Sequence, residues 1–263
     1  MLSREDLVSL GADTDCKYVI DIGASTGVIS DPCYPFITNG DYAGLCIEGN
    51  GAFIDKLSAT ICSNIKIHEG YVTPANVLSI FNKHKVPFEL FLIKIDIDGY
   101  DLEVIKTILK SDYQPIFYIA EINEKIPPPI CFETQFSETY KWDYSHCFGF
   151  SLQSGQRVFE ANGYYIVDLY DMNNILCIRK DKAHLIPQYD FPRDVMKLYD
   201  QEYKNNIKRK SAFPWNNDVD NWLTMTKPMD LKNEILSYFT TNNQRSININ
   251  KNKKLNIDFL LYF

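Results

Sequence analysis

The first part of the chain alternates short apolar runs with segments of helical periodicity. Apolar runs of strand length occur at 17–22, 42–47, 65–72, 91–95 and 116–120. Between them, 53–60 is typical of a helix, and 98–109 carries apolar residues at helical spacing, namely Leu102, Val104, Ile105, Ile108 and Leu109. Strands that alternate with helices predict a parallel sheet covered by helices on both faces.

The pattern changes after the fifth apolar run. Residues 123–143 contain several prolines and show no regular period, whereas 151–162 has the period of a helix. Residues 164–169 and 175–179 are strand-like and flank a polar turn at 171–174, which predicts an antiparallel hairpin. The predicted fold class is therefore α/β: a Rossmann-like, doubly wound, mostly parallel seven-stranded sheet with an antiparallel C-terminal hairpin, whose last strand lies beside the fifth parallel strand.

The chain turns polar after residue 181. We expect one domain over 1–185, followed by a helical C-terminal extension over 186–263. Within the extension, 240–254 (TTNNQRSININKNKK) is of low complexity, which is typical of a mobile polar tail.

The charge and the lengths of the apolar stretches argue against nucleic acid and membranes as partners. The 263 residues carry a formal net charge of -7, and an acidic chain argues against nucleic acid as a partner, because phosphate binding needs a basic surface. No apolar stretch reaches the length of a membrane span, and the first residues lack the apolar core of a signal peptide. The seven cysteines are scattered without a CxxC pair, which suits a reducing compartment. We therefore expect a cytoplasmic protein with no membrane partner.

The segment 18–27, YVIDIGASTG, combines an apolar strand, an acid and a glycine-bearing loop. Gly23 and Gly27 permit tight turns and the close approach of a ligand, and a helix starting near Gly27 would offer free backbone N–H groups. A dinucleotide-binding loop would also need glycine at Ser25 and Val28. That pattern is broken, which disfavours a nicotinamide oxidoreductase.

S-adenosylmethionine fits this loop better than a dinucleotide does. It has no phosphate, so it tolerates Ser25, and its amino group, ribose hydroxyls and positive sulfur favour acidic partners. Asp21 is placed to reach the amino group, and Glu48, which ends the second apolar run, is placed to accept hydrogen bonds from both ribose hydroxyls. The alternative is a plain strand–helix turn with Glu48 as a solvated surface carboxylate.

A second group of acids follows the fourth apolar run. The segment 91–101, FLIKIDIDGYD, delivers Asp96 and Asp98 at the carboxyl end of a strand, where open α/β sheets bind ligands. Glu121 and Asn123 end the next strand, so these side chains are expected to converge. Such oxygen ligands suit Mg²⁺ or Ca²⁺, and we expect Asp96, Glu121 and Asn123 as metal ligands. The alternative is that Asp98 caps the following helix while the other acids are solvated.

Together these motifs resemble those of FkbM-type methyltransferases. The resemblance rests on YVIDIGASTG, YAGLCIEGN, LFLIKIDIDGYDLEVIKTIL, IAEIN and GYYIVDLYDMNNILCIRKD, and it covers 17–181. It implies a class I methyltransferase fold and S-adenosylmethionine-dependent O-methylation of sugars or natural products. It also implies that Asp21, Gly23, Glu48 and Asp96 lie near the cofactor. Ser25 and Thr26 depart from the family, which often has Asn-Ile or a similar pair there.

The leading hypothesis is methyl transfer from S-adenosylmethionine to a hydroxyl of a small molecule or carbohydrate. Asp96, Asp98 or His146 would remove the hydroxyl proton, or a bound metal ion would acidify it. The alternative function is a catalytically inactive, methyltransferase-like module kept for binding or assembly. The residues expected to bind the cofactor are Asp21, Gly23, Ala24, Ser25, Gly27, Glu48, Gly49 and Asp96.

Overall fold

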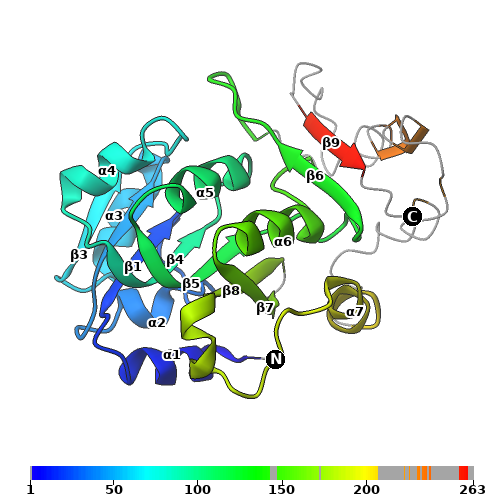
Figure 1. Cartoon of the computed structure of the whole chain (residues 1–263). Coiled ribbons are helices and arrows are strands. Elements are labelled where there is room, and N and C mark those ends of the chain that lie inside the picture. Colours follow the sequence, from blue (N-terminus) through cyan, green and yellow to red (C-terminus); the bar gives the residue numbers. More distant parts are fainter. Residues whose placement is uncertain are drawn as a thin grey trace.

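A seven-stranded sheet forms the centre of the molecule (Figure 1). The computed structural model describes residues 2–142, 147–171 and 173–206, scattered positions between 222 and 237, and the backbone of 255–259. The strands of the sheet run in the order β3-β2-β1-β4-β5-β8-β7. They are β1 (Tyr18–Ile22), β2 (Ala43–Glu48), β3 (Ile65–Glu69), β4 (Glu89–Ile95), β5 (Gln114–Glu121), β7 (Tyr164–Tyr170) and β8 (Asn174–Arg179).

The sheet confirms the predicted fold class. Pairings among β1 to β5 are parallel, whereas β8 is antiparallel to both β5 and β7 and lies between them. The expected hairpin is therefore inserted beside β5. The strand order reverses between β1 and β4, and this switch point is where open α/β sheets bind ligands, beyond the carboxyl ends of the strands.

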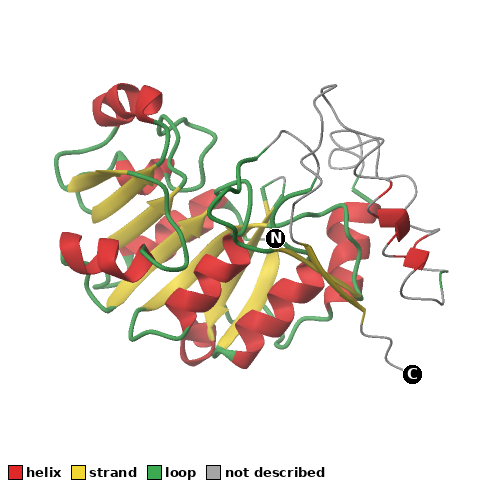
Figure 2. Ribbon diagram, turned by 90° about the horizontal axis from the view of Figure 1, so that it is seen from above, coloured by secondary structure: helices red, strands yellow, loops and turns green. Residues whose placement is uncertain are grey.

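Helices cover both faces of the sheet, as Figure 2 shows. Alternate residues of β1 point to opposite faces: Ile20 and Ile22 belong to one apolar cluster and Val19 to the other. The helices are α1 (Arg4–Ala12), α2 (Tyr34–Ile37), α3 (Gly51–Thr60), α4 (Val77–His84), α5 (Asp101–Leu109), α6 (Leu152–Ala161) and α7 (Val195–Tyr199), with the short turns η1 (Lys180–Leu185) and η2 (Asp200–Lys204). Buried residues of α4, α5, α6 and α7 pack with Ile20 and Ile22, and those of α1, α2 and α3 pack with Val19. Among the described residues, no helix is long and apolar enough to cross a membrane.

A second, two-stranded sheet joins segments that are far apart in the sequence. β6 (Ile130–Thr134) pairs antiparallel with β9 (Leu255–Phe259). The expectation that all of 123–143 is irregular is wrong for β6. The strand ICFET directly follows a run of three prolines. Because prolines are typical of irregular segments, the short apolar run after them is not predicted as a strand. The division of the chain at 185 stays a prediction.

Candidate functional site

The loop after β1 passes closely over the end of β4. Gly23 has φ +81°, and a Cβ there would lie 1.8 Å from the backbone oxygen of Asp96. Gly27 also has a positive φ, of +65°. Both positions therefore need glycine, as the sequence predicts. Ser25 adopts φ +49°, a left-handed conformation that costs a residue with a side chain about 1–2 kcal/mol.

The helix expected to start near Gly27 is not there. Residues 28–33 form turns and bends, and α2 begins only at Tyr34 and spans four residues. Pro32 and Pro35 explain the difference, because proline removes a backbone donor and disfavours helical geometry in the residue before it. The loop therefore offers its own backbone N–H groups, and no regular helix start contributes others.

Glu48 ties this loop to the turn after β2. Its Oε2 accepts a hydrogen bond from the backbone N–H of Ser25 at 2.7 Å, and its Oε1 accepts one from that of Asn50 at 2.7 Å. The residue is only 8% exposed, so the alternative of a solvated surface carboxylate is wrong. Each carboxylate oxygen can accept a second hydrogen bond, which leaves capacity for a pair of ligand hydroxyls.

A buried lysine neutralises the acids beneath the loop. Lys94 Nζ lies 3.3 Å from Asp21 Oδ1 and 3.0 Å from Asp31 Oδ2, and it donates to the backbone oxygen of Gly23 at 3.1 Å. Burial lowers the pKa of Lys94, but Asp21, Asp31 and Asp96 outweigh burial and raise it, so the ammonium stays charged. Burial, with Asp31, raises the pKa of Asp21 to about 7 against the opposing effect of Lys94.

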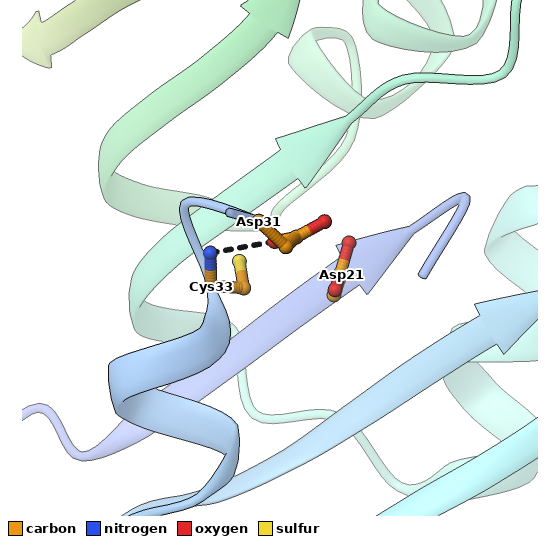
Figure 3. A group of neighbouring side chains, drawn as sticks. All are labelled: Asp21, Asp31 and Cys33. Carbon is orange, nitrogen blue, oxygen red and sulfur yellow. Dashed lines mark hydrogen bonds between the residues drawn. The ribbon is translucent and has the colours of Figure 1, made fainter. Parts of the chain in front are cut away.

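Figure 3 shows the acids of this buried group together with Cys33. Asp31 Oδ1 accepts a hydrogen bond from the backbone N–H of Cys33 at 2.7 Å. Burial raises the pKa of the Cys33 thiol, which removes it as a nucleophile at neutral pH. Asp21, Asp31 and Cys33 lie close enough to bind a metal, but Lys94 already places a positive charge between the two acids. Asp31 is a residue that the sequence reasoning missed; its only signal is the Asp-Pro pair just after the glycine loop.

A second group of acids lies at the carboxyl ends of β4 and β5, and we call it the open cluster. Asp96, Asp98 and Glu121 each place a carboxylate oxygen within 4.8 Å of the others. Lys94 Nζ comes within 3.6 Å of Asp96, but its nearest carboxylate contact is with Asp31 at 3.0 Å. The sequence predicted that Asp96, Asp98 and Glu121 would converge, and the structure brings them together.

Burial and repulsion between like charges raise the pKa values of two acids in the open cluster, Asp98 and Glu121. Burial, then Asp96 and Asp101, raises the pKa of Asp98 to about 7. Burial, then Asp96, also raises the pKa of Glu121 above its usual range. Glu121 Oε1 accepts a hydrogen bond from Asn173, whereas Oε2 is buried without a hydrogen-bond partner among the described residues. Such a site favours a ligand that brings positive charge or a proton.

Asp98 is not the cap of the following helix. α5 begins at Asp101, whose carboxylate accepts hydrogen bonds from the backbone N–H groups of Ile97 at 2.8 Å and Gly99 at 2.9 Å. The cap interpretation of Asp98 is therefore wrong, because Asp101 shapes this turn instead. Asp98 has φ +54°, which Asp tolerates better than most residues.

The other expected site residues are placed as follows. Asn123 is buried beyond β5, and its side-chain amide donates to the backbone oxygen of Phe148 at 3.1 Å. Ala24, a residue of the glycine loop, is buried, and the ring of Tyr71 lies over Gly49. His146 lies outside the described residues. Binding and catalytic roles for these residues stay predictions.

Comparisons with known proteins find solved structures of low similarity. No family model matches the chain, and no curated protein matches it. A structure from Staphylococcus aureus, provisionally assigned as a caffeoyl-CoA O-methyltransferase, shares 14% identity over 67% of this chain and 82% of its own, with a TM-score of 0.43. A SAM-dependent methyltransferase from Aquifex aeolicus shares 10% identity over 68% and 89%, with a TM-score of 0.39. SAM-bound CalS10, an amino pentose methyltransferase from Micromonospora echinaspora, shares 9% identity over 66% and 89%, with a TM-score of 0.39.

The class of fold follows from the sheet itself. Five parallel strands closed by an inserted antiparallel hairpin, in the order β3-β2-β1-β4-β5-β8-β7, make the fold of class I S-adenosylmethionine-dependent methyltransferases. The narrower resemblance to the FkbM family stays a prediction. Fold alone does not establish an activity, so function has to be argued from the site.

Proposed function

We propose that the chain is an S-adenosylmethionine-dependent methyltransferase that methylates a hydroxyl of a sugar or another small molecule. The observation that carries the proposal is the open cluster. Asp96, Asp98 and Glu121 lie together at the carboxyl ends of β4 and β5, and the backbone of Asp96 lies against Gly23 in the glycine loop, which Glu48 joins through Ser25. A cationic ligand with ribose hydroxyls suits both halves of this site.

The residues divide into binding and catalytic groups. Glu48 would accept hydrogen bonds from the ribose hydroxyls, and the loop over 23–27 would lie against the methionine part, because its glycine backbone permits close approach. Asp96, which is partly exposed beside Asp98, would face the positive sulfur. The bound cofactor would supply a methyl group on that sulfur.

Asp98 is the best candidate for the base. Its pKa is about 7, so near neutral pH Asp98 can be present as a carboxylate and can hold the proton that it accepts. When bound, the cofactor would supply the methyl group to the acceptor oxygen, and Asp98 would take the proton of the acceptor hydroxyl. The rest of the rate enhancement comes from aligning oxygen, carbon and sulfur.

A divalent cation is a variant of the same proposal. Asp96 and Glu121 fit the expected oxygen ligands, and Asp98 places a third carboxylate oxygen within 4.8 Å of theirs, while Asn123 stays an expected ligand through its Oδ1. An ion such as Mg²⁺ would acidify the acceptor hydroxyl. The two variants are separable, because a chelator abolishes activity reversibly only where a metal is needed.

Two observations favour the second candidate function, an inactive module kept for binding or assembly. The glycine loop lacks the helix expected after it, and Ser25 occupies a left-handed position where glycine fits best. A module of this kind would keep the fold and the buried Lys94 group but would not bind the cofactor. Cofactor binding therefore decides between the two functions.

The deciding experiment is calorimetric titration of the full chain with S-adenosylmethionine and with its demethylated product. We expect both to bind, and Glu48→Gln to weaken both by about ten-fold or more, since one ribose hydroxyl loses its ionised acceptor. Glu48→Gln is preferred to Glu48→Ala because Ala would release the N–H groups of both Ser25 and Asn50, whereas Gln keeps an acceptor for one of them. Glu5→Gln, on the exposed side of α1, is the matched control. A wild-type chain that binds neither compound would support the inactive module.

A further inference from the structure

Arg4 is a charged residue at a position that local helix formation does not favour. It is the first residue of α1, and a positive charge in the first turn of a helix opposes the helix dipole. The helix is capped without it, because Ser3 Oγ accepts a hydrogen bond from the N–H of Asp6 at 3.1 Å and the Asp6 carboxylate accepts one from the N–H of Ser3 at 2.8 Å. The role of the Arg4 side chain therefore lies in the segments that it contacts.

The guanidinium of Arg4 joins two segments that are far apart in the sequence. Its Nη1 donates to the backbone oxygen of Ile29 at 2.7 Å, and its Nη2 donates to that of Ser30 at 2.8 Å. Nη2 also lies 3.4 Å from Oδ2 of Asp171, in the turn between β7 and β8. The fixed fork of a guanidinium allows these contacts to be made together. Arg4 thus links the segment 28–31, which follows the glycine loop, to the hairpin turn.

The start of the segment 28–31 is poorly held by apolar packing. Val28 and Ile29 are 45% and 73% exposed, and the segment forms only turns and bends. Its end is anchored, because Asp31 lies 3.0 Å from the buried ammonium of Lys94. Segments that bury few apolar groups open locally at a low free energy. The hydrogen bonds from Arg4 therefore hold the part of the segment that packing leaves exposed.

The hairpin turn connects Arg4 to the open cluster. Asn173, two residues beyond Asp171, donates its side-chain amide to Glu121 Oε1 at 2.8 Å, and its backbone oxygen accepts a hydrogen bond from the N–H of Ile122 at 2.7 Å. Glu121 is one of the three acids of the open cluster. Arg4 is thus linked to both halves of the proposed site, the glycine loop and the acids.

We propose that Arg4 is a positioning residue that holds the segment 28–31 and the hairpin turn in the arrangement that binds the cofactor. The inference rests on the proposed function, in which the glycine loop and the open cluster bind S-adenosylmethionine. A chain without this link adopts the binding arrangement for a smaller fraction of the time, and its apparent affinity falls by that fraction. The expected result is therefore a folded chain that binds more weakly.

The test measures the affinity for the demethylated cofactor product by calorimetry, well below the melting temperature of each variant. Arg4→Gln should weaken binding by about 5- to 20-fold, as when the binding arrangement falls to between about a fifth and about a twentieth of the population. Arg4→Lys keeps the charge but not the fork and should recover part of the loss. Lys17→Gln is the matched control, because Lys17 donates to the backbone oxygens of Gly11 and Ala12 at the other end of α1. It should weaken α1 but keep the wild-type affinity.

Hydrogen exchange of the ligand-free chain tests the link itself. The N–H of Asp31 donates to the backbone oxygen of Val28 at 2.9 Å, and the N–H of Ile122 donates to that of Asn173 in the hairpin turn. Arg4→Gln should speed exchange in the peptides that contain these two amides and leave the other strands of the sheet unchanged. Faster exchange throughout the chain, or unchanged exchange at both amides, would overturn the positioning role.

The outcomes separate this inference from the function on which it rests. A wild-type chain that binds neither S-adenosylmethionine nor its product overturns the proposed function and, with it, a role of Arg4 in cofactor binding. A wild-type chain that binds, together with an Arg4→Gln variant of unchanged affinity, overturns the positioning role alone. Equal losses in Arg4→Gln and Lys17→Gln would also overturn it, because they would assign the effect to the stability of α1.

Discussion

Two groups of acids lie at the carboxyl ends of neighbouring strands, and they differ in what balances their charge. Beneath the glycine loop, Asp21 and Asp31 contact the ammonium of Lys94 at 3.3 and 3.0 Å. In the open cluster, Asp96, Asp98 and Glu121 face one another, and only Asp96 comes near that ammonium, at 3.6 Å. The same residue types therefore form a closed ion-pair network in one place and an unbalanced site in the other.

This difference distinguishes acids that stabilise the fold from acids that are suited to bind a ligand. A buried ion pair whose partners are all present holds the chain in one arrangement, and breaking it is costly. A group of carboxylates that repel one another stores an unfavourable interaction, which a positively charged ligand relieves on binding. Substitutions in the first group should lower stability, whereas substitutions in the second should raise stability and remove function.

The largest effect is expected at Lys94. Lys94→Met leaves Asp21 and Asp31 buried without their cation, and we expect a loss of about 3–5 kcal/mol in the free energy of unfolding at pH 8. The loss should be smaller at pH 5, where protonation of Asp21 relieves the charge, since its folded-state pKa is about 7. Urea denaturation at both pH values measures this. Lys106→Met, which removes a partly exposed partner of Glu133, is the control and should lose no more than about 1 kcal/mol.

A smaller loss is expected at Asp101, the acid that shapes the turn beside the open cluster. Asp101→Ala leaves the backbone N–H groups of Ile97 and Gly99 without acceptors, and we expect a loss of about 2–3 kcal/mol. Asp101→Asn retains one acceptor oxygen and should lose less. Chemical denaturation compares the two. Equal stability of Asp101→Ala and wild type would show that the turn does not depend on this carboxylate.

Asp98 should behave in the opposite way. Its pKa rises from 3.8 to about 7 on folding, so the folded chain binds the proton more tightly than the unfolded chain does. The stability contributed by this group is complete below pH 3.8 and is lost as the pH rises through about 7. Asp98→Asn removes the charge, and we expect a gain on the order of 1 kcal/mol at pH 8, no gain near pH 4, and loss of methyl transfer.

The pH dependence of the melting temperature tests this prediction. Between pH 5 and 8, the melting temperature of the wild type should fall more steeply than that of Asp98→Asn. Both proteins are measured in the same buffers. Asp112→Asn, on an exposed carboxylate, should leave the slope unchanged. Parallel curves for wild type and Asp98→Asn would show that Asp98 is not held in an unfavourable charge state.

The smallest effect concerns the glycine loop. Ser25 has φ +49°, so Ser25→Gly should relieve backbone strain and raise stability by up to about 1 kcal/mol, reduced by the greater flexibility of glycine in the unfolded chain. Thermal unfolding is a sufficient measurement. A loss of stability would mean that the Ser25 side chain makes a favourable contribution that outweighs the strain.

The sheet and its hairpin could be predicted because apolar runs that alternate with amphipathic helices specify a parallel sheet, and two strand-like runs around a polar turn specify an antiparallel hairpin. The convergence of Asp96, Asp98 and Glu121 could be predicted for the same reason, since the carboxyl ends of neighbouring parallel strands meet at one edge. These inferences use only local periodicity and topology.

Other features depend on contacts between distant segments and could not be predicted. Lys94 was visible as a polar residue inside a strand, but its ion pair with Asp31 needs the fold of the segment before α2. Pro32 and Pro35 disfavour a helix directly after Gly27, but the prediction of a helix start there rested on the glycine loop alone. The placement of Tyr71 over Gly49 depends on how β2 and β3 pair at their ends.

The most direct test of the central claim is whether a positive charge on the ligand expels a proton from the open cluster. Titration calorimetry at pH 7, in two buffers of different ionisation enthalpy, counts protons released on binding. S-adenosylmethionine has a positive sulfur and its demethylated product a neutral one, so we expect greater proton release for the former, because Asp98 has a pKa of about 7. Asp98→Asn should remove most of the difference. Equal heats in both buffers for both compounds, or no binding of either, would contradict the account.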